Sequence, residues 1–182
     1  AEKNGHTFAC DLVGQISDMN KGIYLDEELK NNTPTNFCIG VAGYPEKHFE
    51  APSINNDVQN TLKKVQQGAE YIVTQLFFDN TRFFEYVEKC RQVGISVPII
   101  PGIKPIATKR HLSLLPHRFH VDIPDELVKS VVNCRDNEQV REVGVEWAIQ
   151  QCKELKEAGV PVLHFYSMGK VDNIQTIAKA VF

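Results

Sequence analysis

Residues 53–65 have the sequence SINNDVQNTLKKV, and they follow an apolar run, residues 37–41, through a short loop. Read as a helix, this stretch has an apolar stripe at the i, i+4, i+7 spacing of an amphipathic helix. The stripe consists of Val58, Leu62, Val65 and Ala69. An apolar strand that passes through a loop into an amphipathic helix is the repeating unit of α/β proteins, so we expect an α/β fold.

A second face of the same helix is polar and holds Asp57, Asn60, Lys63 and Lys64. A carboxylate accepts hydrogen bonds from hydroxyls, an amide both donates and accepts, and an ammonium group neutralises phosphate charge. Near the end of a strand, these side chains suit a ligand that carries sugar hydroxyls and phosphates. The alternative interpretation of the same charge pattern is a solvated helix face.

The composition is that of an ordinary globular protein, with 182 residues, 42% of them hydrophobic and 24% charged. One domain with a sizeable core is expected at this length. The formal net charge of -3 gives no electrostatic reason to expect nucleic acid or an anionic membrane as a partner. No apolar run is long enough to span a bilayer and the first residues do not resemble a signal peptide, so we expect a cytoplasmic location.

The five cysteines are odd in number, scattered along the chain and never spaced as CxxC. We expect reduced structural thiols, with Cys38, Cys90 and Cys152 on core faces, and no zinc site. His117 and His120 have no third ligand at a suitable spacing, so no metal site is predicted.

The chain alternates between apolar strands and amphipathic helices, which predicts parallel strands joined by helical crossovers in a single unit, residues 1–182. The predicted strands cover residues 37–43, 71–78, 97–103 and 160–166, and the first is expected to be buried on both faces. The predicted helices cover residues 7–19, 53–68, 79–94, 108–115, 138–158 and 174–181, another helix begins at 124–125, and loops are expected at 20–36 and 116–123. Asp79 and Thr108 are the expected N-caps of their helices.

Four strands leave two architectures open, a small open sheet or half of an eight-stranded barrel. In both architectures a ligand site lies at the carboxyl ends of the strands. The loops at those ends contain Tyr44, His48, Gln75, Lys104 and Lys170. Gln75 interrupts an apolar strand, where a buried amide needs hydrogen-bond partners, so a ligand contact is favoured over a structural bond.

Three segments resemble one enzyme family: residues 42–79 (AGYPEKHFEAPSINNDVQNTLKKVQQGAEYIVTQLFFD), 97–106 (VPIIPGIKPI) and 164–170 (HFYSMGK). The family's patterns are approximately AAYPExHPEA, a helix with Asp, Asn and paired basic residues, ITQFFFD, IIPGIxPI and HFYTLNR. From about Phe8 to the C-terminus, the chain is therefore similar to methylenetetrahydrofolate reductase. The resemblance implies a (β/α)8 TIM barrel, of which this chain would cover roughly the last four β/α units.

The resemblance also implies a flavin-dependent reaction of one-carbon metabolism. In this family FAD lies at the carboxyl ends of the strands and NADH or NADPH reduces it. The reduced flavin then passes hydride to 5,10-methylenetetrahydrofolate, which becomes 5-methyltetrahydrofolate. The positions that match flavin contacts of the family are Ala9, Tyr44, His48, Ala51, Asp57, Asn60, Lys63 and Lys64.

Three further positions match folate contacts of the family. Gln75 corresponds to a glutamine that contacts the pterin, and an amide can both donate to and accept from such a ring. His111 stands where glutamine is usual, and Lys170 replaces the arginine of HFYTLNR that holds the glutamate tail. The aromatic residue that stacks on the substrate in the family would lie near Leu115, where no aromatic residue matches.

Two family features have no counterpart in this sequence, a first-strand glutamate proposed as the general acid and an LRGD-like motif on a later strand. No catalytic residue is therefore expected in this chain, which would correspond to the C-terminal half of the barrel. The expected partners are a folate substrate, the N-terminal half of the barrel in the same or another chain, and further copies in a homo-oligomer. The alternative functions are a catalytically inactive FAD- or folate-binding or interaction module, and a folate-dependent methyltransferase, which the YPExH loop disfavours.

Overall fold

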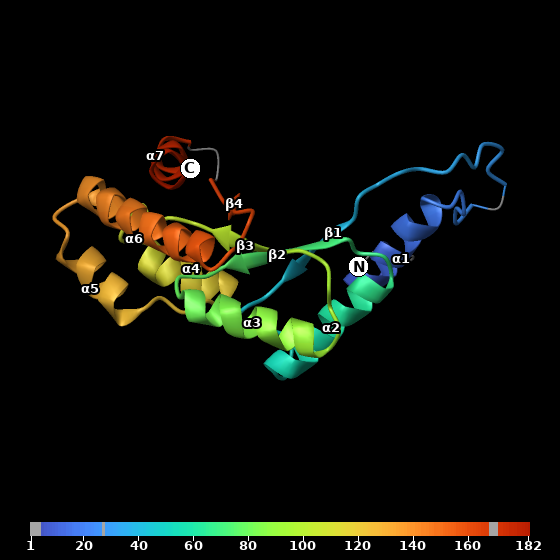
Figure 1. Cartoon of the computed structure of the whole chain (residues 1–182), viewed down its shortest axis with the longest axis horizontal. Coiled ribbons are helices and arrows are strands. Elements are labelled where there is room, and N and C mark those ends of the chain that lie inside the picture. The colour runs from blue at the N-terminus through green and yellow to red at the C-terminus, as the bar shows by residue number, and fades with distance from the viewer. Residues whose placement is uncertain (1–4, 27, 168–170) are drawn as a thin grey trace.

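The structure is a computed structural model that describes residues 5–26, 28–167 and 171–182. Its strands are β1 (Gly40–Gly43), β2 (Tyr71–Leu76), β3 (Ile99–Ile103) and β4 (His164–Phe165). Its helices are α1 (Ala9–Met19), α2 (Ile54–Gln66), α3 (Asn80–Gln92), α4 (His111–Phe119), α5 (Asp125–Asn133), α6 (Asn137–Glu157) and α7 (Asp172–Val181). Figure 1 shows α1 toward one end of the molecule, α5 and α6 at the other, and the strands between them.

The four strands are parallel and lie in the sheet in the order in which they follow one another in the chain. One helix, α2, connects β1 to β2, α3 connects β2 to β3, and three helices, α4 to α6, lie between β3 and β4. These connections confirm the predicted helical crossovers. A doubly wound sheet reverses its strand order at a switch point, whereas successive neighbours throughout are the arrangement of a (β/α)8 barrel. The observed order favours the barrel.

Burial alternates along β2, the second strand of the sheet. Residues 72, 74 and 76 are buried, while residues 71, 73 and 75 are half-buried. One face of the sheet therefore packs on the helices and the other is more open, which is the face that carries Gln75. The core between sheet and helices includes Ile72, Phe77, Phe83, Cys90, Ile103 and Leu155.

The prediction that residues 37–43 are buried on both faces is wrong. Gly40 and Ala42 are exposed, and the Phe37 side chain is 53% exposed. The reason is that β1 is an edge strand that pairs only with β2, and no second layer covers its open face within the described residues.

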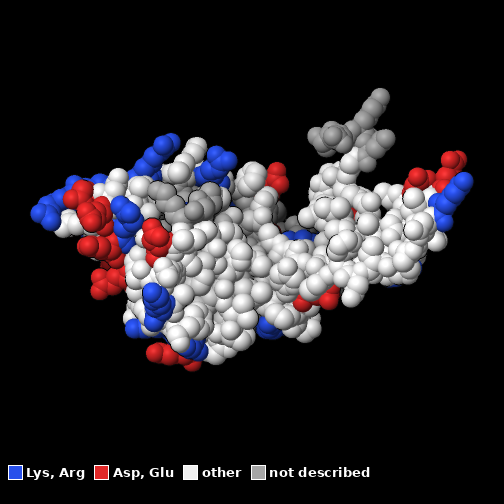
Figure 2. All heavy atoms as spheres, turned by 90° about the horizontal axis from the view of Figure 1, so that it is seen from above, with Lys and Arg blue, Asp and Glu red and all other residues white. Residues whose placement is uncertain are grey.

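Figure 2 shows one face of the molecule. On this face the charged side chains gather toward the two ends, with a largely uncharged surface between them.

The predicted helix ends around the first two crossovers are confirmed. The Ser53 hydroxyl accepts a hydrogen bond from the Asn56 N–H at 3.2 Å at the start of α2, and the Asp79 carboxylate accepts from the Thr81 N–H at 2.9 Å at the start of α3. After the end of α2, Gly68 has a φ of +117°. Such a left-handed conformation favours glycine, which is why the helix stops there.

The region after β3 differs from the prediction. Thr108 does not cap a helix with its side chain; only its main-chain carbonyl accepts from the His111 N–H, at 3.0 Å. The helix α4 begins at His111 and continues through Pro116, so the predicted loop from residue 116 is wrong. Leu115 is 1% exposed and Phe119 packs on the same apolar cluster, and this packing outweighs the unfavourable proline.

One other prediction concerns a side chain that the structure leaves exposed, and another concerns the length of the last strand. Cys38 is exposed rather than on a core face, while Cys90 and Cys152 are buried as predicted. The last strand is shorter than predicted, and His164 on it is exposed. None of the helices in the described ranges is both long and apolar enough to cross a bilayer. The same residues hold no group of three or more His, Cys, Asp or Glu side chains arranged to bind a metal ion.

Candidate functional site

The polar face of α2 lies against the end of β1 and the loop that follows it. Asp57 is 5% exposed and Lys64 is 9% exposed, so the solvated-face interpretation is wrong for both side chains. The Asp57 carboxylate accepts a hydrogen bond from the main-chain N–H of His48 at 3.0 Å. The Lys64 ammonium group donates to the main-chain carbonyl of Ala42. These bonds hold the helix and the strand end together around one polar site.

A cavity of about 370 Å³ lies over this polar face. Besides the buried pair, the exposed side chains of Asn60 and Lys63 line it, and the start of α1 closes one side of it. Of the eight positions expected to contact flavin, the cavity brings together Ala9, Tyr44, His48, Asp57, Asn60, Lys63 and Lys64. The eighth, Ala51, does not line the cavity, because it is 7% exposed and its carbonyl accepts from the Lys47 ammonium group at 2.8 Å.

Burial and neighbouring charge set the electrostatics of this cavity. Burial lowers the pKa of Lys64, and the nearby Asp57 carboxylate opposes that change. Burial also raises the pKa of Tyr44, with the negative charges of Asp57 and Glu50 adding to the rise. The Tyr44 and His48 rings meet edge to face with centroids 4.7 Å apart, which makes one wall of the cavity aromatic.

A second cavity of about 800 Å³ lies where β2, β3 and β4 end. Gln75 and His111, two of the three expected folate contacts, both line it. The third, Lys170, lies outside the described residues. Lys104, Arg110 and Arg118 add positive charge, and no aspartate or glutamate of the described residues lines the cavity. The cavity therefore suits a largely apolar ligand with an anionic end.

Gln75 and His111 present hydrogen-bonding groups to this second cavity. The Gln75 Oε1 accepts from the N–H of Leu76 at 2.9 Å, which leaves the amide nitrogen available as a donor. The His111 Nδ1 accepts from the N–H of Ala107 at 3.2 Å, which assigns the ring proton to Nε2. Burial, and then the Lys104 charge, lowers the pKa of His111. The imidazole is therefore neutral at pH 7 and its Nε2–H can donate to a ligand.

The structure adds residues to this cavity that the sequence did not single out as site residues: Arg110, Arg118, Phe119 and Tyr166. Phe119 lies one turn beyond Leu115, close to the place where the stacking aromatic of the family was expected. A predicted helix that continued through Pro116 would have included Phe119. The Tyr166 hydroxyl donates to the Thr74 carbonyl at 2.9 Å, and its position in the HFY segment was a usable signal.

The two cavities are neighbours on the same edge of the sheet. Gly43, which precedes Tyr44 of the first cavity, pairs with Thr74, which precedes Gln75 of the second. The carboxyl ends of adjacent parallel strands bring them together, as expected for a sheet of this kind. A ligand in one cavity would lie close to a ligand in the other.

The chain is similar in sequence to known reductases and in fold to a solved protein. The chain is 37% identical to methylenetetrahydrofolate reductase 1 of Schizosaccharomyces pombe over 167 residues, which are 91% of this chain and 26% of the relative. It is 31% identical over 166 residues to 5,10-methylenetetrahydrofolate reductase of Salmonella typhimurium, covering 91% of this chain and 51% of the relative. A solved protein from Clostridium thermocellum that binds two copies of 5-methyl-5,6,7,8-tetrahydrofolic acid has a TM-score of 0.51 and 20% identity, over 78% of this chain and 51% of that chain.

The chain thus spans about a quarter of the length of its yeast relative (26%) and about half of its bacterial relative (51%). The likeness to the Clostridium protein is one of fold, because its identity is only 20%. The family model for methylenetetrahydrofolate reductase matches residues 2–181, nearly the whole sequence. This chain belongs to the methylenetetrahydrofolate reductase family.

Proposed function

We propose that this chain carries part of the FAD site and part of the folate site of an enzyme that reduces 5,10-methylenetetrahydrofolate to 5-methyltetrahydrofolate, with NADH or NADPH as the hydride donor. One observation supports this most strongly. Residues expected at the two sites line two neighbouring cavities at the carboxyl edge of one parallel sheet. Hydride transfer from a flavin to a folate needs such neighbouring sites.

The donor set of the first cavity fits a flavin nucleotide. Lys63 is exposed to the cavity and Lys64 has one of its donors on Ala42, so both ammonium groups have donors left for phosphate oxygens. Asp57 and Asn60 lie on the same helix face and would accept from ribityl or ribose hydroxyls. When bound, FAD supplies the hydride chemistry, which no side chain can supply. The residues of this chain bind and orient it.

The second cavity fits the pterin and the acidic tail of a folate. The Gln75 amide and the His111 Nε2–H would position the pterin ring, and Phe119 offers an aromatic face. Lys104, Arg110 and Arg118 would neutralise carboxylates of the tail. The Clostridium protein of similar fold binds a methylated folate, which supports a folate for this chain. The residue that protonates the substrate is proposed to lie in the other half of the barrel.

The proposal requires a second half of the barrel, from the same chain or another. Supporting it are the consecutive order of the strands and the apolar side chains left exposed at the α1 and β1 end, Phe8 (66%), Leu12 (48%) and Phe37 (53%). Covering these side chains would extend the barrel on the β1 side and close the flavin cavity, which α1 borders. The homo-oligomer and the cytoplasmic location expected from the sequence remain predictions.

Titration with FAD tests this function. The purified chain, alone and together with the N-terminal half of a family member, is mixed with FAD and separated from free flavin, and absorbance near about 450 nm is measured. The proposal predicts retained flavin and, for the completed barrel, turnover of methylenetetrahydrofolate with NADH or NADPH. Retained flavin without turnover in the completed barrel would favour the inactive binding module. A folded, colourless protein that rejects FAD in both forms would contradict the proposal.

A further inference from the structure

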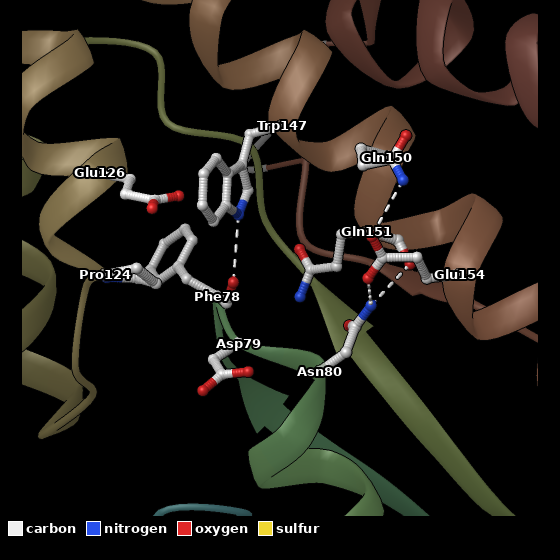
Figure 3. Close-up of a pocket in the computed structure, with 9 residues that line it drawn as sticks. All are labelled: Phe78, Asp79, Asn80, Pro124, Glu126, Trp147, Gln150, Gln151 and Glu154. Atoms are coloured by element: carbon white, nitrogen blue, oxygen red, sulfur yellow. Dashed lines mark hydrogen bonds between the residues drawn. The ribbon is translucent and has the colours of Figure 1, made fainter.

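A third cavity, of about 400 Å³, lies where α6 packs against the end of β2 and the starts of α3 and α5 (Figure 3). It shares no lining residue with the two cavities assigned above to flavin and folate. The proposed function therefore leaves this cavity without a role. Its lining has a consistent chemical character, which defines the kind of ligand that it could bind.

The nitrogen donors around this cavity already donate to protein atoms. The Trp147 indole N–H donates to the Phe78 carbonyl at 3.0 Å, and the Gln151 amide donates to the Phe77 carbonyl at 3.0 Å. The Asn80 amide nitrogen donates to the Gln151 carbonyl at 3.1 Å and to the Glu154 carboxylate at 2.9 Å (Figure 3). What the side chains offer to a ligand is therefore mainly oxygen acceptors.

The acceptors carry negative charge, because Asp79, Glu126 and Glu154 are among them. The two Glu154 oxygens also accept from the Asn80 and Gln150 amides, at 2.9 Å each. No lysine, arginine or histidine from the described parts of the chain lines the cavity. Asn80 adds a second, independent feature. Its side chain is only 8% exposed, and its Oδ1 accepts no hydrogen bond from any described residue. Buried amide oxygens are normally paired, so this oxygen lacks the donor that such an atom usually has.

The same cavity has an aromatic wall. Figure 3 shows the Trp147 indole standing between the Glu126 carboxylate and the Gln151 amide, with the Phe78 ring below it. Aromatic faces attract ammonium and guanidinium groups, and tryptophan does so best. The carboxylates are not placed as metal ligands, since the described residues contain no metal-binding group of three or more. An organic cation fits this lining better than a metal ion.

We propose that this cavity binds an organic cation with a primary ammonium or guanidinium head. Both heads carry only donors and a positive charge, which complements a lining of acceptors, carboxylates and an indole ring. The cation could be a free aliphatic amine or guanidine, or a lysine or arginine side chain of another protein. The two sources share this chemistry and are separated by the experiment.

Trp147 is the only tryptophan in the sequence, so its fluorescence reports on ligands that bind against its indole ring, and the charge variants below assign the binding to this cavity. The full chain is titrated at low salt with n-butylammonium and n-butylguanidinium, with 1-butanol as the uncharged control of similar size. A saturable change in emission is expected for the two cations, with 1-butanol binding at least about tenfold more weakly. Lysine and arginine blocked as N-acetyl methylamides are titrated in the same way. If they bind as tightly as the free cations, the occupant is identified as a protein side chain. Weaker binding of the blocked forms identifies a free amine or guanidine.

Two matched double variants complete the test. Glu126→Gln with Glu154→Gln removes two charges from the lining but keeps an acceptor for Asn80, and should weaken cation binding about five- to tenfold. Glu142→Gln with Glu157→Gln removes the same charge elsewhere on α6 and should leave affinity within about twofold. The proposal is overturned if neither fluorescence nor ligand-observed NMR detects cation binding. Equal binding of 1-butanol, or equal losses in the two double variants, would also overturn it.

Discussion

The Glu46 carboxyl group titrates close to neutral pH. Burial raises the pKa of Glu46 from 4.5 to about 7. The negative charges of Asp122 and Asp79 add to the rise, while a hydrogen bond from the main-chain N–H of Asp122 and the charge of Arg82 oppose it. The folded protein therefore binds this proton more tightly than the unfolded chain does.

It follows that Glu46 makes the protein less stable as the pH rises. The stabilisation from its proton is complete below the unfolded pKa of 4.5 and is lost as the pH rises through about 7. The unfolding free energy of the parent protein should therefore be lower at about pH 8 than at about pH 5, in part because of Glu46. Glu46→Gln should make this difference smaller by about 1–2 kcal/mol, a figure reduced for screening by water. Urea unfolding at both pH values measures it. Glu50→Gln, an exposed residue of the same loop, is the control, and an unchanged pH dependence in Glu46→Gln would refute the assignment.

Asp57→Asn tests the flavin cavity with little change in shape. The amide oxygen can still accept from the His48 N–H, so the loop after β1 should keep its position. Loss of the buried charge should weaken FAD binding about tenfold or more, because charge-assisted hydrogen bonds to hydroxyls are lost. Flavin fluorescence titration measures the affinity. Asp18→Asn, at a half-exposed site on α1, should bind as the parent does, and equal affinity in both variants would rule out the proposed contact.

Gln75→Met tests the folate cavity in a protein that contains the complete barrel. Methionine keeps the length of the side chain but cannot hydrogen-bond to a pterin as an amide can. The folate half-reaction should slow about tenfold or more, while flavin reduction by NADH or NADPH stays within about twofold. Stopped-flow absorbance separates the two half-reactions. Equal losses in both would mean that Gln75 has a structural role.

Between elements, the loop after β1 is attached to the loop between α4 and α5. The Phe49 ring stacks on the His120 ring with centroids 5.1 Å apart, and the Glu46 carboxylate accepts from the Asp122 N–H. His120 ends α4 with a φ of 53°, a left-handed conformation that is uncommon outside glycine. The loop that borders the flavin cavity and the helix that lines the folate cavity are thereby held in a fixed relation.

Gly144 sets the position of α6 against the loop after β3. A Cβ atom at Gly144 would overlap the main-chain carbonyl of Ile106, which cannot move without shifting the loop. Gly144→Ala should therefore cost about 2–3 kcal/mol in urea unfolding. Gly14→Ala on α1 would meet only the flexible end of Gln67, and should be neutral or stabilising by up to about 1 kcal/mol. The packing would need another explanation if both variants had the same stability.

The sequence predicted the elements whose signals are local. The period of Val58, Leu62 and Val65 was enough for α2, and the polar spacing on its other face located Asp57 and Lys64. The course of α4 was not predictable in this way, because Pro116 is a local stop signal that only the packing of Leu115 and Phe119 overrides. Arg118 and Phe119, which follow Pro116 on that helix, were therefore missed as site residues.

At the scale of the whole molecule, an apolar sequence shows that a strand could be buried but not which neighbours bury it. The exposed face of β1 and the exposed His164 on β4 belong to the two edge strands of the sheet, and the sequence pattern contained no sign of this difference. The same edges explain why the proposed function involves a second half of the barrel. The first cavity borders the loop after the edge strand β1 and the second lies where β2, β3 and β4 end, so we propose that the added half completes them.

Hydrogen exchange measured by mass spectrometry, with FAD and with 5-methyltetrahydrofolate added separately, tests the placement of the two ligands most directly. We predict that FAD slows exchange in residues 44–64, and that the folate slows it in residues 104–119 when the barrel is complete. Residues 142–157 of α6, around the third cavity, should be unaffected by either ligand. No protection from FAD in residues 44–64, or protection of the two segments by the opposite ligands, would contradict the account.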